Sequence, residues 1–127
     1  MPKQHLNPSG MHTPTGYSHV VKAGDTIYVA GQVVVAPDGS LVGKDDPAAQ
    51  AEQIYQNLQN ALASVGASLQ HLVKTTTYVV SLDCIDAVRA ARAKYLANDP
   101  PTSTLLVVSR LARPEFLLEI EAVAYVG

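Results

Sequence analysis

The segment FLLEIEAVAYV at residues 116–126 restricts the possible folds more than any other part of the chain. Its apolar, β-branched and aromatic residues favour a strand. Both alternating residue sets are largely apolar, with Leu118, Ile120, Ala122 and Ala124 in one and Leu117, Val123 and Tyr125 in the other. Because successive side chains point to opposite faces of a sheet, this strand requires cover on both faces. It is either a central strand enclosed within one chain or, as we favour, part of a sheet that packs against another subunit.

Four other segments carry strand patterns and two carry helical patterns. The strand patterns lie in YSHVVKAGD and in residues 26–35, 73–80 and 104–108. Apolar residues recur with helical spacing over residues 47–65 and 85–97. The order β-β-α-β-α-β-β predicts an α+β fold in which two helices cover one face of a sheet. Residues 1–127 fit one domain, and we expect residues 1–15, with three prolines, to form an N-terminal arm.

Both predicted helices have start signals in the sequence. Asp46 is a suitable N-cap for the first, because its carboxylate can accept a hydrogen bond from a backbone N–H of the first turn. Pro47 suits the first helical position, and Gly66 is a suitable C-terminal stop. Asp83 is the N-cap residue expected for the second helix.

Composition and charge exclude several classes of function. The net charge of −2 and the absence of a basic run argue against a nucleic-acid partner. The single cysteine, Cys84, rules out an internal disulfide and fits a reducing cytosol. The sequence has no signal-peptide pattern and no apolar stretch of the roughly 20 residues that span a membrane. We therefore expect a cytoplasmic protein without a membrane partner.

The sequence offers no metal-binding motif. His5, His12, His19 and His71 include no i, i+4 pair, and Cys84 lies far from them along the chain. Cys84 precedes the second predicted helix, where a reactive thiolate would be stabilised. We favour the alternative, in which this cysteine is a small buried residue, and we expect no metal.

Glu119 and Glu121 are candidates for catalysis. They share one face of an otherwise apolar strand, where a carboxylate is costly unless paired and its pKa tends to rise. Either is a candidate general acid or base. The alternative is an ion pair with Lys74 or Arg110 across strands or subunits. We favour the ion pair for Glu121 and leave both interpretations open for Glu119.

Tyr17, His19 and Gly31 suggest a binding pocket. Tyr17 and His19 share a face of the first predicted strand. Gly31 interrupts the next one, and a strand glycine lets another group approach the backbone closely. Together these residues would line a pocket. The alternative is that Tyr17 packs on the core while His19 points to solvent.

Four segments, taken in order, resemble the Rid (RidA/YjgF) family. They are GYSHVVKAGDTIYVAGQV, AAQAEQIYQNLQNALASVGAS, HLVKTTTYVVSLD and PPTSTLLVVSRLARPEFLLEIEAVA, and they run from Gly16 to Ala124. The resemblance implies a chorismate-mutase-like fold and a homotrimer whose sheets form an internal barrel. It also implies three pockets at the subunit interfaces, in agreement with the two-sided final strand.

The activity that this resemblance implies is hydrolysis of reactive imines and enamines, such as 2-iminobutanoate and 2-iminopropanoate, to a ketoacid and ammonia without a cofactor. In archetypal members an arginine of a Pro-x-Arg-Ser/Thr motif binds the substrate carboxylate. Here the segment reads Pro101-Thr102-Ser103, so Ser103 takes the place of that arginine. A charged hydrogen bond to a carboxylate contributes about 1.5–3 kcal/mol, so substrate preference should change.

The other pocket positions of the family are partly matched. Tyr17, Gly31 and Glu119 agree with the pattern, whereas Ala30 replaces a frequent serine and His19 stands where glutamine is common. The missing cation leaves three alternatives. Another arginine supplies it, the ligand lacks an α-carboxylate, or the pocket binds without catalysis.

We therefore expect a homotrimer that acts on a small imine, enamine or related carbonyl compound. Glu119 would activate water, Tyr17 and Gly31 would orient the substrate, and Ser103 would donate a hydrogen bond. The candidate replacement cations are Arg89 and Arg110. The alternative is a trimeric module that binds a metabolite or a partner without turnover. Ribonuclease activity rests only on an older name of the family, and the acidic charge balance disfavours it.

Overall fold

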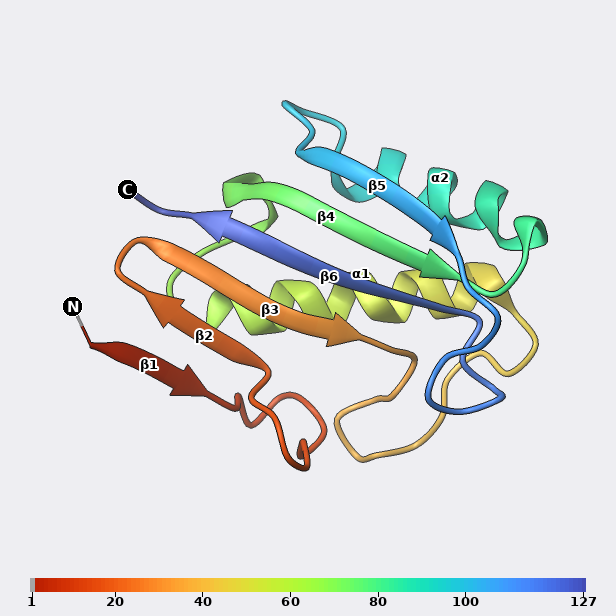
Figure 1. Ribbon diagram of the computed structural model, residues 1–127, viewed down its shortest axis with the longest axis horizontal. Helices are drawn as coiled ribbons and strands as arrows, with labels where there is room; N and C mark the ends of the chain where they lie inside the picture. Colours follow the sequence, from red (N-terminus) through yellow and green to blue (C-terminus); the bar gives the residue numbers. More distant parts are fainter. Residues whose placement is uncertain (1) are drawn as a thin grey trace.

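Six strands and two α-helices form the framework of residues 2–127, the part of the chain that this computed structural model describes (Figure 1). In chain order they are β1 (Lys3–Leu6), β2 (Val20–Ala23), β3 (Thr26–Gln32), α1 (Pro47–Ala63), β4 (Leu72–Val79), α2 (Ile85–Tyr95), β5 (Thr102–Val107) and β6 (Leu118–Tyr125). Short 3₁₀ helices at Leu69–His71 and Leu82–Cys84 precede β4 and α2. None of the helices in this part of the chain is long and apolar enough to cross a membrane.

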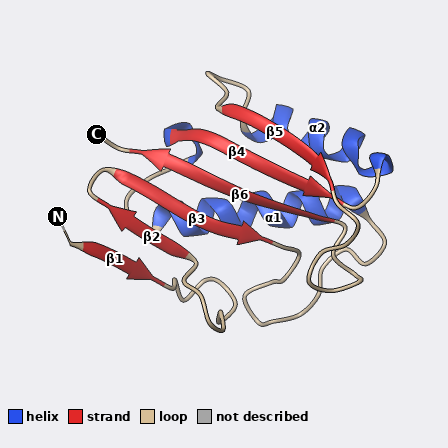
Figure 2. Ribbon diagram, in the orientation of Figure 1, coloured by secondary structure: helices blue, strands red, loops and turns tan. Residues whose placement is uncertain are grey.

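The six strands form one sheet in the order β1-β2-β3-β6-β4-β5. Neighbouring strands run antiparallel except β4 and β5, which are parallel and are connected through α2. Figures 1 and 2 show both helices on one face of the sheet and leave the opposite face uncovered. The predicted α+β fold with two helices on one face is therefore confirmed, and β6 is a central strand between β3 and β4.

Strand β1 differs from the prediction of an N-terminal arm over residues 1–15. Its four residues pair with β2, from Lys3 opposite Ala23 to Leu6 opposite Val20. Three of its four side chains are exposed, so the segment has no apolar pattern that would predict a strand. Its pairing depends on backbone hydrogen bonds to the edge of β2, which side-chain patterns do not reveal.

The sheet and the helices enclose the main hydrophobic core. The side chains of β6 that point toward the helices are almost completely buried, namely Leu118, Ile120, Ala122 and Ala124. Buried residues at helical spacing on α1 belong to the same cluster, namely Ile54, Tyr55, Leu58 and Leu62. The apolar residues at helical spacing on α1 and those at alternating positions on β6 therefore pack in a single core.

Strand β3 contains a β-bulge. Val29 pairs with Ala122 and Gln32 pairs with Ile120, so β3 has two residues between these pairs where β6 has one. Ala30 and Gly31 therefore together oppose Glu121. Val29 and Gln32 are both buried as a result, although residues three apart on a regular strand point to opposite faces. The strand ends at Gln32, three residues before the predicted end.

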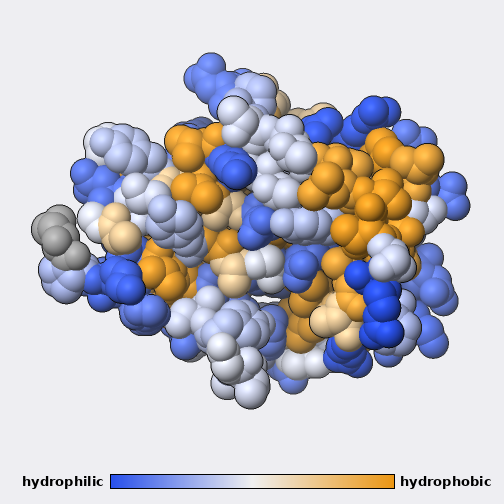
Figure 3. Space-filling view, viewed as in Figure 1, coloured by the Kyte–Doolittle hydropathy of each residue, from blue (hydrophilic) through white to orange (hydrophobic). Residues whose placement is uncertain are grey.

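The uncovered face of the sheet carries large apolar and aromatic side chains. Tyr28, Leu106 and Tyr125 are each about half exposed, with exposed fractions of 51%, 45% and 52%. Figure 3 shows apolar side chains gathered near the right-hand ends of β4 and β5. The single chain thus covers β6 only on its helix side, and the other side presents the kind of surface that marks an interaction site.

Helix α1 begins as predicted, whereas α2 does not. The Asp46 carboxylate accepts a hydrogen bond from the Ala49 N–H at 3.1 Å. Helix α2 begins after Cys84, and no side chain caps it, so the predicted Asp83 cap is wrong. The chain enters α2 through a 3₁₀ turn, and there the Ser81 hydroxyl accepts a hydrogen bond from the Asp83 N–H.

We predict that Asp46→Ala lowers the free energy of unfolding by about 1 kcal/mol, because it removes the capping bond of α1. Asp83→Ala is the matched control, since this exposed carboxylate caps no helix, and it should change stability by less than about 0.5 kcal/mol. Urea unfolding followed by circular dichroism measures both variants. Equal losses in the two would contradict this assignment of the caps.

Candidate functional site

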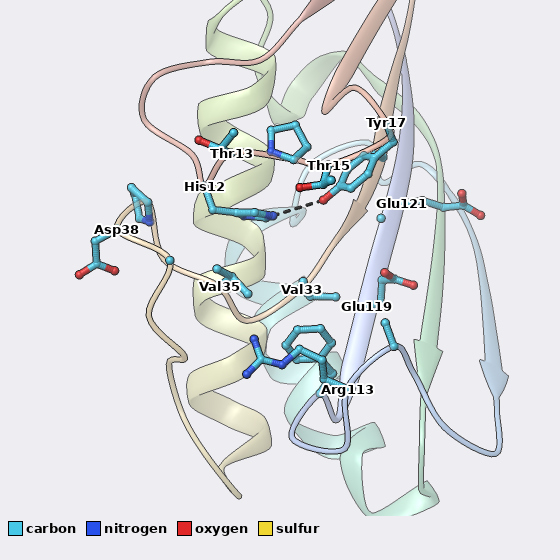
Figure 4. Close-up of a pocket in the computed structure, with 17 residues that line it drawn as sticks. His12, Thr13, Thr15, Tyr17, Val33, Val35, Asp38, Arg113, Glu119 and Glu121 are labelled. Atoms are coloured by element: carbon cyan, nitrogen blue, oxygen red, sulfur yellow. Dashed lines mark hydrogen bonds between the residues drawn. The ribbon is translucent and has the colours of Figure 1, made fainter.

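A cavity of about 970 Å³ opens where the N-terminal loop, the bulge of β3 and the loop before β6 meet (Figure 4). Its polar and charged lining residues include His12, Tyr17, Asp38, Arg113, Glu119 and Glu121. Its apolar wall includes Val33, Val35 and Phe116. Of the pocket and catalytic candidates named from the sequence, Tyr17, Ala30, Gly31, Glu119 and Glu121 line this one cavity.

Glu119 lies directly over the backbone of Gly31. A Cβ added to Gly31 would lie 2.7 Å from the Glu119 Cδ and 2.8 Å from its Oε1, which is closer than real Cβ contacts. The close approach that a strand glycine predicts is therefore present, and the approaching group is a carboxylate. Glycine at position 31 is a steric requirement of the position of Glu119.

The Glu119 carboxyl forms no hydrogen bond or ion pair with residues 2–127. Burial raises the pKa of this carboxyl above its usual range, and the negative charge of Glu121 raises it further. Glu121 is exposed and accepts a hydrogen bond from the Tyr78 hydroxyl at 2.6 Å. Within this part of the chain, neither Glu121, for which an ion pair with Lys74 or Arg110 was favoured, nor Glu119, for which it was left open, forms that pair. A pair across subunits stays a prediction. An unpaired, half-buried carboxylate is a suitable general base.

His12 and Tyr17 form a pair at the side of the cavity. The His12 Nε2 lies 3.3 Å from the Tyr17 hydroxyl, and the His12 Nδ1 is buried without a partner (Figure 4). Burial, and then the neighbouring His19, lower the pKa of His12. Since an enclosed N–H without an acceptor is costly, the ring proton belongs on Nε2 and is donated to Tyr17. The Tyr17 O–H is then free to donate to a ligand.

Tyr17 remains protonated in this arrangement. Burial raises the pKa of its hydroxyl, and the charge of Glu119 raises it further. The Tyr17 side chain is 48% exposed, so it does not pack on the core. Tyr17 also does not lie on the predicted strand, because β2 begins at Val20. Tyr17 lies in the loop before β2 and presents a hydrogen-bond donor to the cavity that Glu119 also lines.

His19 does not line the cavity, but it forms hydrogen bonds with the loop and the strand that do. It is 1% exposed, which contradicts the alternative in which it points to solvent. Its Nε2 lies 2.7 Å from the His12 carbonyl oxygen, so Nε2 donates, and Nδ1 accepts from the Gln32 amide at 3.2 Å. Gln32 also donates to the Ala30 carbonyl at 3.0 Å. The bulge, the N-terminal loop and this buried imidazole are thus connected by hydrogen bonds.

Arg113 is the arginine that lines the cavity. Its guanidinium stacks at 5.4 Å from the centre of the Phe116 ring and lies 3.8 Å from the Glu115 carboxylate. The side chain is 52% exposed, so this ion pair is weak. The predicted replacement cations lie elsewhere, since Arg89 is exposed on α2 and Arg110 donates to the Leu111 carbonyl outside the cavity lining.

Ser103 does not line the cavity within this chain. It lies on the edge strand β5, and its hydroxyl accepts a hydrogen bond from the Arg92 guanidinium of α2 at 3.4 Å. Cys84 is buried, its pKa is raised chiefly by that burial, and its thiol contacts the Leu117 carbonyl oxygen at 3.9 Å. This position fits the structural interpretation of the cysteine. No three His, Cys, Asp or Glu side chains of residues 2–127 are grouped to hold a metal ion.

His12 and Arg113 are two of the lining residues that sequence reasoning missed. His12 lies in the segment that was predicted to form an N-terminal arm, and Arg113 lies in an irregular loop between two strands. Neither position has a periodic pattern around it that would indicate the direction of its side chain. The one available signal is compositional, because residues 109–115, SRLARPE, concentrate two arginines just before the strand that carries Glu119.

Comparison with known proteins assigns the class to which this fold and cavity belong. The family described as Endoribonuclease L-PSP matches residues 9–126. A RutC family protein of Pyrococcus abyssi is 33% identical over 109 residues, covering 86% of this chain and 85% of that protein. The chain therefore belongs to the Endoribonuclease L-PSP family, which comprises the RidA, YjgF and RutC proteins, and the resemblance seen in the sequence is confirmed.

Solved structures agree with this assignment. YyfA from Yersinia pestis, a member of the conserved Rid family, superposes with a TM-score of 0.93 at 27% identity, with 98% of this chain and 100% of that chain covered. RidA from an Antarctic Psychrobacter superposes with a TM-score of 0.90 at 26% identity, with coverages of 97% and 99%. The α+β sheet with its two helices is therefore the Rid fold over nearly the whole chain.

We predict that Gly31→Ala lowers the free energy of unfolding by about 1–3 kcal/mol, because the new methyl group overlaps the Glu119 carboxyl. Gly10→Ala is the matched control, since a Cβ there meets nothing within 4 Å, and it should change stability by less than about 0.5 kcal/mol. Urea unfolding measures both. A Gly31→Ala protein as stable as the wild type would show that Glu119 does not occupy this position.

Proposed function

We propose that the protein hydrolyses small imines or enamines in this cavity to a carbonyl compound and ammonia, without a cofactor. The observation that carries the proposal is the unpaired, half-buried Glu119 carboxylate, whose pKa is raised, in the same cavity as the Tyr17 hydroxyl. Membership of the family that includes RidA supports the substrate class. Hydrolysis of a C=N bond needs a placed water and a proton carrier, and these residues supply both roles.

The first step is addition of water to the C=N carbon. The Glu119 carboxylate takes a proton from a water as the water oxygen attacks the carbon. Glu119 then passes this proton to the nitrogen, and a carbinolamine forms. A raised pKa makes the Glu119 carboxylate a stronger base than an ordinary carboxylate.

The second step is loss of ammonia. Glu119 takes the proton of the carbinolamine hydroxyl and passes it to the nitrogen, the C–N bond breaks, and the hydroxyl oxygen becomes the carbonyl oxygen. The balance is one imine and one water to one carbonyl compound and one ammonia. The Tyr17 O–H, oriented by His12, donates a hydrogen bond to the ligand and helps to hold it over Gly31.

We also propose that the protein is a homotrimer in which the uncovered sheet faces pack together. The exposed side chains of that face, such as Tyr28, Leu106 and Tyr125, support this assembly. The pockets that the family resemblance implies at subunit interfaces would bring Ser103 of a neighbouring subunit to the cavity, where its hydroxyl would donate a hydrogen bond to the ligand. The cytoplasmic location expected from the sequence stays a prediction.

We predict that sedimentation equilibrium gives a mass close to three times the 13.5 kDa of one chain. Leu106→Glu should shift the protein toward monomers, because it places a charge on the proposed contact face. Leu82→Glu is the matched control, since Leu82 is 68% exposed and lies outside the sheet. A monomeric wild type, or equal dissociation of the two variants, would refute the proposed assembly.

Binding without turnover is the alternative that a specific observation favours. Ser103 stands where the resemblance places a charged arginine, and a pocket with a weaker anchor can retain a ligand without positioning it for reaction. Ligand-induced thermal stabilisation without any product would identify this function. We do not propose ribonuclease activity, because three carboxylates and one arginine line the cavity and would disfavour a phosphate chain.

We predict that the wild-type protein accelerates ammonia release from imines generated freshly by an amino-acid oxidase. Glu119→Gln should lower the rate by about 10²-fold or more, because it removes the general base. Asp86→Asn is the matched control, an exposed carboxylate on α2 outside the cavity lining, and it should retain full activity. Wild-type rates equal to the uncatalysed rate for every imine tested would refute the enzymatic function.

The pH dependence of the same assay separates catalysis from an indirect effect of the mutation. The rate should fall as the pH drops through the raised pKa of Glu119, because protonation removes the base. Glu121→Gln removes one of the two causes of that shift, so the fall should move to lower pH. An unchanged profile in Glu121→Gln would exclude Glu119 as the group that controls the rate.

A further inference from the structure

The cavity separates its charges into two regions. The Glu119 and Glu121 carboxylates lie along β6 at one side, and the only arginine or lysine that lines the cavity in residues 2–127, Arg113, lies in the loop before that strand. Figure 4 shows the Arg113 guanidinium and the Glu119 carboxylate pointing away from each other. A ligand that contacts both regions therefore carries an anionic group at one end and a different polar group at the other.

The Arg113 guanidinium has donors available for such a ligand. Its one charged partner among residues 2–127 is Glu115, at 3.8 Å, which exceeds hydrogen-bond distance. The guanidinium lies over the Phe116 ring, which also lines the cavity. Asp38 also lines the cavity, but its carboxylate accepts hydrogen bonds from the backbone N–H and the hydroxyl of Ser40. A planar guanidinium with free donors suits a carboxylate.

Apolar side chains line the cavity between its polar groups. Val33 and Val35 lie between His12 and Arg113 in Figure 4, and Phe116 continues the wall beside the guanidinium. These side chains offer a ligand no hydrogen bond, so the part of the ligand that covers them is apolar. An α-imino acid has its carboxylate bonded directly to the C=N carbon and provides no such part.

We infer that the ligand carries its carboxylate on Arg113 and its C=N or C=O group beside Glu119 and Tyr17, with an apolar spacer between them. This inference rests on the proposed function for the reacting end of the ligand. It makes Arg113 a specificity-determining residue. The preferred compounds are imino or oxo acids whose two functional groups are separated by several carbons.

Binding of three oxo compounds tests this inference without any turnover. The probes are 5-oxohexanoate, with a distant carboxylate, hexan-2-one, without a carboxylate, and 2-oxobutanoate, with an adjacent one. Calorimetric titration should show that 5-oxohexanoate binds at least about tenfold tighter than either of the others, which corresponds to about 1.4 kcal/mol. The preference should weaken at high salt, because Arg113 is half exposed.

Arginine variants decide whether Arg113 is responsible. Arg113→Gln should abolish the preference for 5-oxohexanoate, Arg113→Lys should retain part of it, and Arg110→Gln, an exposed arginine outside the cavity lining, should leave it intact. Equal binding of the three probes by the wild type, no binding of any probe, or an unchanged preference in Arg113→Gln would each overturn the inference. Melting temperatures confirm that each variant is folded.

The two proposals can fail separately. Tight 5-oxohexanoate binding that depends on Arg113, without ammonia release from any imine, would refute catalysis and leave the ligand class standing. Ammonia release that depends on Glu119 but not on Arg113, with equal rates for short and long imines, would support catalysis and refute this ligand class.

Discussion

The β-bulge at Ala30 and Gly31 is the feature on which the whole site depends. By placing two residues of β3 opposite one residue of β6, it keeps Gln32 inside the molecule and turns Gly31 toward the cavity. The buried Gln32 amide then contacts His19, whose imidazole donates to the His12 backbone. The same change of register gives the Glu119 carboxylate a surface without a side chain to lie on. Bulges next to active sites redirect side chains in this way.

A second buried amide positions the loop that carries Arg113. Gln50 of α1 is fully buried, and its amide donates to the carbonyl oxygens of Gly43 and Glu115 at 3.0 Å each. Its side-chain oxygen accepts from the Leu117 N–H at 2.9 Å. Because unpaired polar groups are costly in the interior, these bonds hold both ends of residues 115–117 against α1. The charged end of the cavity therefore depends on the helix layer behind the sheet.

Sequence patterns predicted the framework better than the site. The helix over residues 47–63 and the strands β3, β4 and β6 follow from periods of 3.6 and 2, because each buries one face against the same core. Strand β1 was missed because its pairing uses backbone groups at an edge, and the α2 cap was wrong because a 3₁₀ turn precedes the helix. Glu119 was named as a charge and Gly31 as a glycine in apolar strands, and Tyr17 was named from a strand position that is a loop in the structure. His12 and Arg113 lie in loops without any period.

The sequence by itself determined the α+β class, the Rid resemblance and the presence of a carboxylate within the apolar last strand, since these depend on local patterns and on residue types. Only the tertiary structure decided which groups surround that carboxylate. It brought His12 of an early loop beside Tyr17, and it made Arg113, in place of Arg89 or Arg110, the arginine of the cavity. The direction of a loop side chain depends on contacts with residues that are distant in the sequence. Here those contacts involve the bulge of β3 and the amide of Gln50, and local sequence patterns do not predict them.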